Sequence, residues 1–197
     1  MKKLTREKLI QTGARAMLAK SYHAVGIQEV LVKIDVPKGS FYHYFHSKED
    51  FCVAIIKYYG EQLAKSITEK LSSRKYSPRN RLKEYFLAIK DYYQKTGYHQ
   101  GCLVAKLAVE VAHSSPDIRM ALKSEFDRWV GLFADCIREA QQNGEIVAGH
   151  QPDELAEFIY TSWEGALIRM QVNHDLGSID NFINYVFNCV IPLNQNQ

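Results

Sequence analysis

Hydrophobic and polar residues follow a helical period along nearly the whole chain. A clear case places four hydrophobic residues at positions i, i+3, i+4 and i+7 of one helix face: Ile27, Val30, Leu31 and Ile34. We find no sustained alternation of apolar and polar residues, which would mark a half-buried strand. The pattern therefore predicts an all-α protein.

Capping residues, prolines and glycines divide this pattern into separate helices. Gly26 and Ser47 stand where N-caps are expected, and Pro116 follows a capping Ser115. Gly177 supplies a stop signal late in the chain. The expected helices span residues 4–20, 27–34, 38–45, 48–71, 79–95, 101–113, 116–142, 152–173 and 178–190.

The first three expected helices have the spacing of a helix-turn-helix unit. Two short helices are separated by a three-residue turn at 35–37, and a longer helix precedes them. In the second short helix, Phe41 and Phe45 share one side and are expected to pack inward. The remaining side chains, which can donate to bases or phosphates, then face outward: Lys38, Ser40, Tyr42 and His43.

The distribution of charge agrees with a nucleic-acid partner at the front of the chain. The formal net charge is only +3, but residues 1–50 hold nine Lys and Arg against five Asp and Glu. Residues 51–197 hold 16 against 17 and are close to neutral. The basic segment thus coincides with the predicted helix-turn-helix unit.

The segment VPKGSFYHYFHSKEDF at residues 36–51 resembles the recognition-helix signature of TetR-family repressors. The resemblance implies a homodimer that binds a palindromic double-stranded operator and is released by a small-molecule effector. It places base contacts at Gln28, Lys38, Gly39, Tyr42 and His43, and phosphate contacts at Ser40, Tyr44 and Lys48. Two residues depart from the family pattern: Ile27 stands where many members carry threonine, and Asp35 where glycine usually ends the second helix.

The same resemblance divides the chain into a DNA-binding domain at 1–47 and an effector-binding and dimerisation domain at 48–197. Two apolar stripes near the end of the chain are expected to build a four-helix bundle between subunits, or else to pack within the monomer. The first stripe comprises Leu155, Phe158, Ile159, Trp163, Ala166, Leu167 and Met170. The second comprises Ile179, Phe182, Ile183, Val186, Phe187 and Val190.

Residues 101–119, GCLVAKLAVEVAHSSPDIR, further resemble the N-ethylmaleimide-responsive, NemR-like branch of the family, which senses reactive electrophiles. Cys102 is expected in the first turn of its helix, where the helix dipole favours the thiolate, with Lys106 one turn further along. An ordinary buried cysteine is the alternative. The branch pairs its cysteine with a lysine of the penultimate helix, where this chain has Gln171.

A noncovalent pocket for a small hydrophobic or aromatic effector is the second hypothesis. Its lining would be aromatic, although such residues also serve as core: Tyr92, Trp129, Phe133, Tyr160 and Trp163. Three other cysteines, Cys52, Cys136 and Cys189, lie on apolar helix faces and are expected to be structural.

Other classes of protein find little support in the sequence. No Walker loop, GxGxxG, HExxH or GxSxG motif is present, so we expect neither an enzyme nor a cofactor. His43 and His46 lack the cysteine or carboxylate partners of a zinc site, and no metal is expected. A secretory leader or membrane span is not expected either, which predicts a cytoplasmic protein. A helical interaction module without DNA binding remains a remote alternative.

Overall fold

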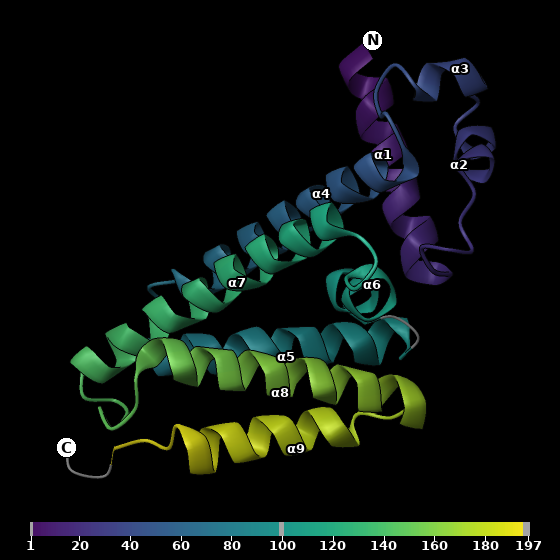
Figure 1. Ribbon diagram of the computed structural model, residues 1–197. Helices are drawn as coiled ribbons and strands as arrows, with labels where there is room; N and C mark the ends of the chain where they lie inside the picture. Colours follow the sequence, from purple (N-terminus) through teal and green to yellow (C-terminus); the bar gives the residue numbers. More distant parts are fainter. Residues whose placement is uncertain (1, 99–100, 195–197) are drawn as a thin grey trace. The chain divides into compact units, whose positions relative to one another are not determined.

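The computed structural model describes residues 2–98 and 101–194, and every regular element in this part is a helix (Figure 1). The prediction of an all-α fold is confirmed. The side chains of residues 2–4 and 38 lie outside the described part. The elements are α1 (Lys2–Ala19), α2 (Ile27–Lys33), α3 (Lys38–Phe41), α4 (Lys48–Leu71), α5 (Pro78–Thr96), α6 (Leu103–Val111), α7 (Pro116–Gln142), α8 (Pro152–Asn173), α9 (Gly177–Tyr185) and a π-helical turn, η1 (Val186–Val190).

Local capping explains where the helices begin. The Ser47 hydroxyl accepts the N–H of Asp50 at 3.0 Å, and the Ser115 hydroxyl accepts the N–H of Ile118 at 3.1 Å. Both serines therefore cap their helices as predicted. The third helix is shorter than expected, because after Phe41 the chain continues as a turn in which the Phe41 carbonyl accepts the N–H groups of both Tyr44 and Phe45.

The chain forms two compact units. Unit 1 comprises Met1–Gln62 and Cys102–Phe126, and unit 2 comprises Leu63–Gly101 and Asp127–Gln197. The long helices α4 and α7 contribute residues to both units. This division groups α6 with the first three helices. The predicted functional boundary between residues 47 and 48 is a different division and stays a prediction.

Unit 1 has a small aromatic core beneath the helix-turn-helix. The rings of Phe41, Phe45 and Phe51 are buried, with centroids 4.8–5.3 Å apart. Helix α1 approaches this core at Gly13, where a Cβ atom would lie 2.4 Å from Cζ of Phe51. Because only glycine permits this approach, Gly13 sets how closely α1 packs on α4.

Unit 2 has a larger aromatic core centred on Phe86 of α5. Its buried ring contacts five other rings at centroid distances of 4.9–6.3 Å: Tyr85, Phe133, Trp163, Phe182 and Phe187. Helices α8 and α9 run side by side (Figure 1). Three of these rings come from α8, α9 and η1, one from each. These contacts make an aromatic cluster the centre of the unit 2 core.

The expectation that the two apolar stripes form the subunit interface is wrong for most of their residues. All members of both stripes except Phe158 and Val190 are buried within the single chain. They pack into the core of unit 2, which was the alternative that the sequence left open. A different face of α8 carries the exposed apolar side chains Phe158, Ile168 and Val172.

Within the described residues, no helix combines the length and apolar character that crossing a bilayer requires. The same residues contain no group of three or more His, Cys, Asp or Glu side chains arranged to hold a metal ion.

Candidate DNA-binding interface and effector region

The turn between α2 and α3 is closed by backbone hydrogen bonds that require a left-handed residue. The N–H of Val36 donates to the carbonyl of Leu31 at 3.2 Å, which leaves Asp35 with φ of 53°. This is the closure that glycine favours at helix ends. Asp35 thus occupies the strained position at which the family pattern has glycine, and it places a carboxylate in the turn before the recognition helix.

Helix α3 and its following turn separate inward from outward residues as predicted. Phe41 and Phe45 are buried, whereas Tyr42 is 54% exposed and His43 is exposed. The Tyr42 ring packs edge-on against Phe41, with centroids 5.4 Å apart, and this contact holds the ring in place. The remaining predicted DNA contacts are exposed or half-exposed: Gln28, Gly39, Ser40 and Tyr44. The side chain of Lys38, also predicted to contact bases, lies outside the described part.

Lys48, predicted to contact a phosphate, is half-buried at the start of α4. Its ammonium lies 4.6 Å from the centroid of the Tyr22 ring and donates to the His23 carbonyl at 3.5 Å. Burial lowers the pKa of this ammonium from its usual value. Lys48 therefore packs on the connection between α1 and α2, and its phosphate contact stays a prediction.

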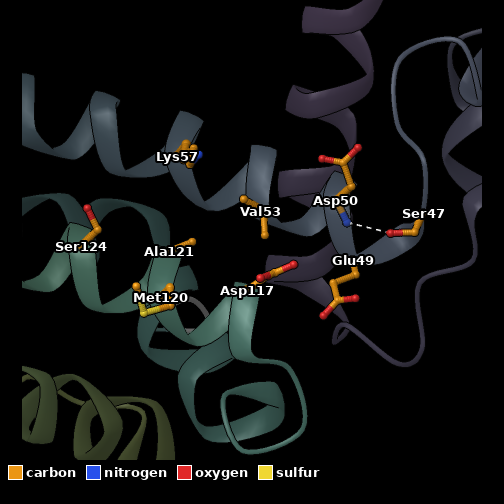
Figure 2. A pocket seen from close by; sticks show the side chains of 9 residues that line it. All are labelled: Ser47, Glu49, Asp50, Val53, Lys57, Asp117, Met120, Ala121 and Ser124. Carbon is orange, nitrogen blue, oxygen red and sulfur yellow. Dashed lines mark hydrogen bonds between the residues drawn. The ribbon is translucent and has the colours of Figure 1, made fainter.

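A groove of about 620 Å³ lies between the first turns of α4 and of α7 in unit 1 (Figure 2). Three carboxylates, those of Glu49, Asp50 and Asp117, line it together with Lys57 and the apolar Met120. Asp50 accepts the N–H of His46, and Glu49 accepts the Ser115 hydroxyl. Because carboxylates repel phosphates, this acidic groove is unsuited to DNA.

The structure places Cys102 one residue earlier than the sequence predicted. It is the N-cap residue of α6, not a member of the first turn, and its side chain is buried. Lys106 lies one turn further along, where its ammonium donates to the carbonyls of Leu18 and Lys20 at 2.8 and 2.6 Å. Both residues belong to unit 1. The predicted reactive pair therefore includes a lysine that already binds the end of α1.

Four of the five predicted pocket aromatics pack in the core of unit 2. Trp129, Phe133, Tyr160 and Trp163 are buried, and the Tyr160 ring lies 5.7–6.0 Å from those of Phe133 and Trp129. Tyr92 differs: it is half-exposed and packs edge-on against Tyr93. The structure thus brings four of these rings together and leaves Tyr92 outside that cluster.

No disulfide links the four cysteines. Burial raises the pKa of the Cys52 thiol to about 12 and that of Cys136 to about 12 as well, so both are inert structural residues as predicted. Cys189 is exposed on η1, which corrects the expectation that it is structural. The helical period predicted that Cys189 shares an apolar face with its neighbours. In the structure, the buried residues of η1 are Val186 and Phe187.

Gln171, at the position where electrophile sensors carry lysine, lies against the glycine that precedes Cys102. A Cβ atom on Gly101 would lie 2.5 Å from its Nε2 atom. That nitrogen donates to the Leu167 carbonyl at 3.3 Å. A neutral amide therefore occupies the position in which the branch has a cation.

Sequence reasoning missed Glu110 and Arg79. Glu110 of α6 accepts the backbone N–H groups of Tyr22 and His23, each at 2.9 Å. Arg79 is a buried cation that donates to the carbonyls of Ile191 and Phe187 at 2.8 and 2.5 Å. One signal was available: Lys106 and Glu110 are the charged residues of an otherwise apolar nine-residue helix.

Family models match both parts of the chain. The model described as bacterial regulatory proteins, tetR family, matches residues 9–55, and the tetracyclin repressor-like C-terminal domain matches residues 78–186. This chain belongs to the TetR family. It is accordingly a DNA-binding transcription regulator and not an enzyme, as the sequence predicted.

Three relatives show how far the likeness extends. The transcriptional repressor DhaR of Mycobacterium sp. strain GP1 is 34% identical over 97% of this chain and 94% of its own length. The regulator AcuR of Cereibacter sphaeroides is 36% identical over 86% and 77% of the two chains. The repressor NemR of Escherichia coli K12 is 30% identical over 94% of both. The crystal structure of reduced E. coli NemR superposes with a TM-score of 0.89, at 29% identity, over 97% of this chain and 99% of that one. The predicted resemblance to NemR is confirmed.

Proposed function

We propose that this repressor binds a palindromic operator as a homodimer through α3 and the turn that follows it. The observation that carries the proposal is the separation of buried Phe41 and Phe45 from exposed Tyr42 and His43. It presents donor side chains on a rigid aromatic base, as major-groove recognition requires.

The test uses labelled DNA from the promoter of the gene that encodes this protein and random DNA of equal length. We expect wild type to prefer its promoter, and His43→Ala to change that preference more than it changes binding to random DNA. His150→Ala, an exposed histidine of unit 2, is the matched control. Equal affinity of wild type for both DNAs would exclude the proposal.

The proposed dimer surface is the outer face of α8. Five exposed residues recur there with alternating spacings of three and four, which is the spacing of a helix-pairing seam: Phe158, Thr161, Gly165, Ile168 and Val172. A Cβ atom on Gly165 would meet nothing within 4 Å, so a partner helix has room to approach closely. A two-fold axis would set this face against its own copy.

Ile168→Asp tests the surface, because a charge at its centre would be buried without a partner. We expect the dimer dissociation constant to rise by at least about 30-fold, measured by analytical ultracentrifugation. Val147→Asp, at an apolar side chain that is equally exposed, serves as the control and leaves the dimer intact. Dissociation by both variants or by neither would contradict the assignment.

We further propose that a small effector releases the DNA and that Cys102 is the thiol through which an electrophile acts. The buried position of Cys102 at the start of α6 supports a modification that must displace this helix. The alternative is a noncovalent ligand among the aromatic rings of unit 2. Two features support this alternative: Gln171 is neutral where the branch has a cation, and Lys106 donates to the Leu18 carbonyl at the end of α1.

N-ethylmaleimide separates the two hypotheses. Burial raises the pKa of the Cys52 and Cys136 thiols, so we expect Cys102 and the exposed Cys189 to react with the reagent first. We expect treated wild type and treated Cys189→Ser to lose operator affinity, and treated Cys102→Ser to keep it. Intact-mass spectrometry records the modification. If wild type still binds the operator after Cys102 has been alkylated, the Cys102 hypothesis is excluded and the noncovalent effector remains.

A further inference from the structure

Helix α6 holds the connection between α1 and α2 with two oppositely charged side chains. This connection, residues 20–26, leads directly into the helix-turn-helix. Lys106 donates to the carbonyls of Leu18 and Lys20 at the end of α1. One helical turn later, Glu110 accepts the N–H groups of Tyr22 and His23.

The two side chains match the polarity of the backbone groups that they bind. The last carbonyls of a helix carry partial negative charge and lack helical partners, so an ammonium stabilises them. The N–H groups beyond the helix end also lack helical partners, and a carboxylate accepts both. Two residues of one helix thereby bind one carbonyl in the last turn of α1 and three backbone groups of the connection, and we call this pair the α6 clamp.

The ionic state of Glu110 suits this role. Burial opposes ionisation, but the hydrogen bonds from the His23 and Tyr22 N–H groups outweigh it and hold the pKa of the carboxyl below its usual value. The carboxylate is therefore charged at neutral pH. A charged acceptor forms stronger hydrogen bonds to N–H groups than a neutral one.

The clamp binds the connection to a firmly packed helix. Leu103, Val104, Leu107 and Val111 of α6 are buried, so α6 cannot shift without moving its neighbours. Lys48 of α4 packs on the same connection through Tyr22 and the His23 carbonyl. The connection is thus held from α6 and from the first part of α4, and both of these belong to unit 1 with it.

We propose that Lys106 and Glu110 are positioning residues for DNA binding: through them, the place of α6 sets the place of α1 and α2, and hence of the recognition helix. The proposal rests on the proposed operator binding. It gives α6 a direct connection to the helix-turn-helix. It also gives Lys106 a role other than activation of the Cys102 thiol.

The test combines Glu110→Gln and Lys106→Met, which keep side-chain size and remove charge, with the double variant. We expect each single variant to weaken promoter binding by about 2- to 30-fold. The double variant should bind the promoter about as well as the single variant with the lower affinity, because the loss of either charged side chain already releases the connection. The slope of affinity against salt should stay unchanged, since no phosphate contact is removed.

Amide hydrogen exchange supplies a readout that does not depend on DNA. Glu110→Gln should accelerate exchange at Tyr22 and His23, and Glu110→Asp should restore much of the protection. The matched controls are Glu154→Gln and Lys95→Met, exposed residues of unit 2, which should change neither exchange nor affinity.

The outcomes separate the alternatives. Promoter affinity that stays at the wild-type value while both amides lose protection would overturn the positioning role. Unchanged protection in Glu110→Gln would overturn the clamp itself. A flatter salt slope in Lys106→Met would show a direct phosphate contact instead. If wild type has no preference for its promoter, the proposed function fails and the positioning role fails with it, while the exchange data still decide whether the clamp exists.

Discussion

The two compact units differ in where their characteristic side chains lie: those of unit 1 are on the surface, and those of unit 2 are in the core. In unit 1, a small core of three phenylalanines supports exposed polar side chains such as Tyr42 and His43. In unit 2, a larger buried cluster of aromatic rings surrounds Phe86, while Tyr92, Phe158 and Tyr185 are exposed. The difference suggests that substitutions on the outer face of unit 1 should affect binding, whereas substitutions in unit 2 should affect stability.

The two units also use charged side chains that bind backbone groups differently. Unit 1 uses the half-buried Lys106 and Glu110 at the connection between α1 and α2. Unit 2 uses Arg79, whose guanidinium binds two carbonyls at the end of the chain and lies 5.4 Å from the centroid of the Phe187 ring. The first arrangement joins α6 to the connection between α1 and α2, and the second joins α5 to η1 and the residue after it in the core of unit 2.

The strongest test of the comparison is Phe86→Ala. The substitution removes a ring that five others contact, and we expect a loss of about 3–5 kcal/mol in the free energy of unfolding. Urea denaturation at a fixed protein concentration measures it. Phe86→Leu, which retains most of the volume, should lose clearly less. A loss below about 1 kcal/mol for the alanine variant would show that the aromatic core is not what stabilises unit 2.

Arg79→Met should have the next largest effect on stability. It leaves the carbonyls of Phe187 and Ile191 buried without their donor, which costs about 1–3 kcal/mol. Thermal unfolding measures the change, with the exposed Arg119→Met as control. Promoter affinity per folded dimer should be unaltered, and a selective loss of affinity would contradict the separation of roles between the units.

Tyr42→Ala should show the reverse behaviour. We expect promoter affinity to fall about tenfold, which is roughly 1.4 kcal/mol of binding free energy. The free energy of unfolding should change by less than about 0.5 kcal/mol, because the side chain is largely exposed. Fluorescence anisotropy and urea denaturation of the same preparation measure the two effects. A variant that unfolds early but binds normally when folded would reverse the comparison.

Asp35→Gly should have the smallest effect on stability, and we expect it to stabilise the protein. The left-handed backbone at Asp35 suits glycine better, so we expect a gain of about 0.5 kcal/mol in the free energy of unfolding. Asp35→Asn separates charge from backbone, because asparagine tolerates the same conformation without the carboxylate. Tighter promoter binding by both variants would show that the acid itself opposes DNA. Loss of stability in the glycine variant would show that the carboxylate serves the turn.

The sequence predicted the helices most accurately where start and stop signals are local. The predicted limits of α7 and α8 agree with the structure, since each begins at a proline and ends in a short polar segment. The third helix was predicted too long: Phe45 lies in the turn after α3, where its ring packs against Phe51 of α4. Periodicity alone does not show such a contact.

What the sequence determined by itself was the all-α fold, the TetR family and the division of the recognition helix into buried and exposed sides. Each of these follows from residues a few positions apart. Tertiary structure alone decided that the apolar stripes of α8 and α9 pack inside the chain and that Lys106 binds the end of α1. A helical period shows which residues share a face, but not what covers that face. The partner carbonyl of Lys106 lies 88 residues away, and only folding brings the two together.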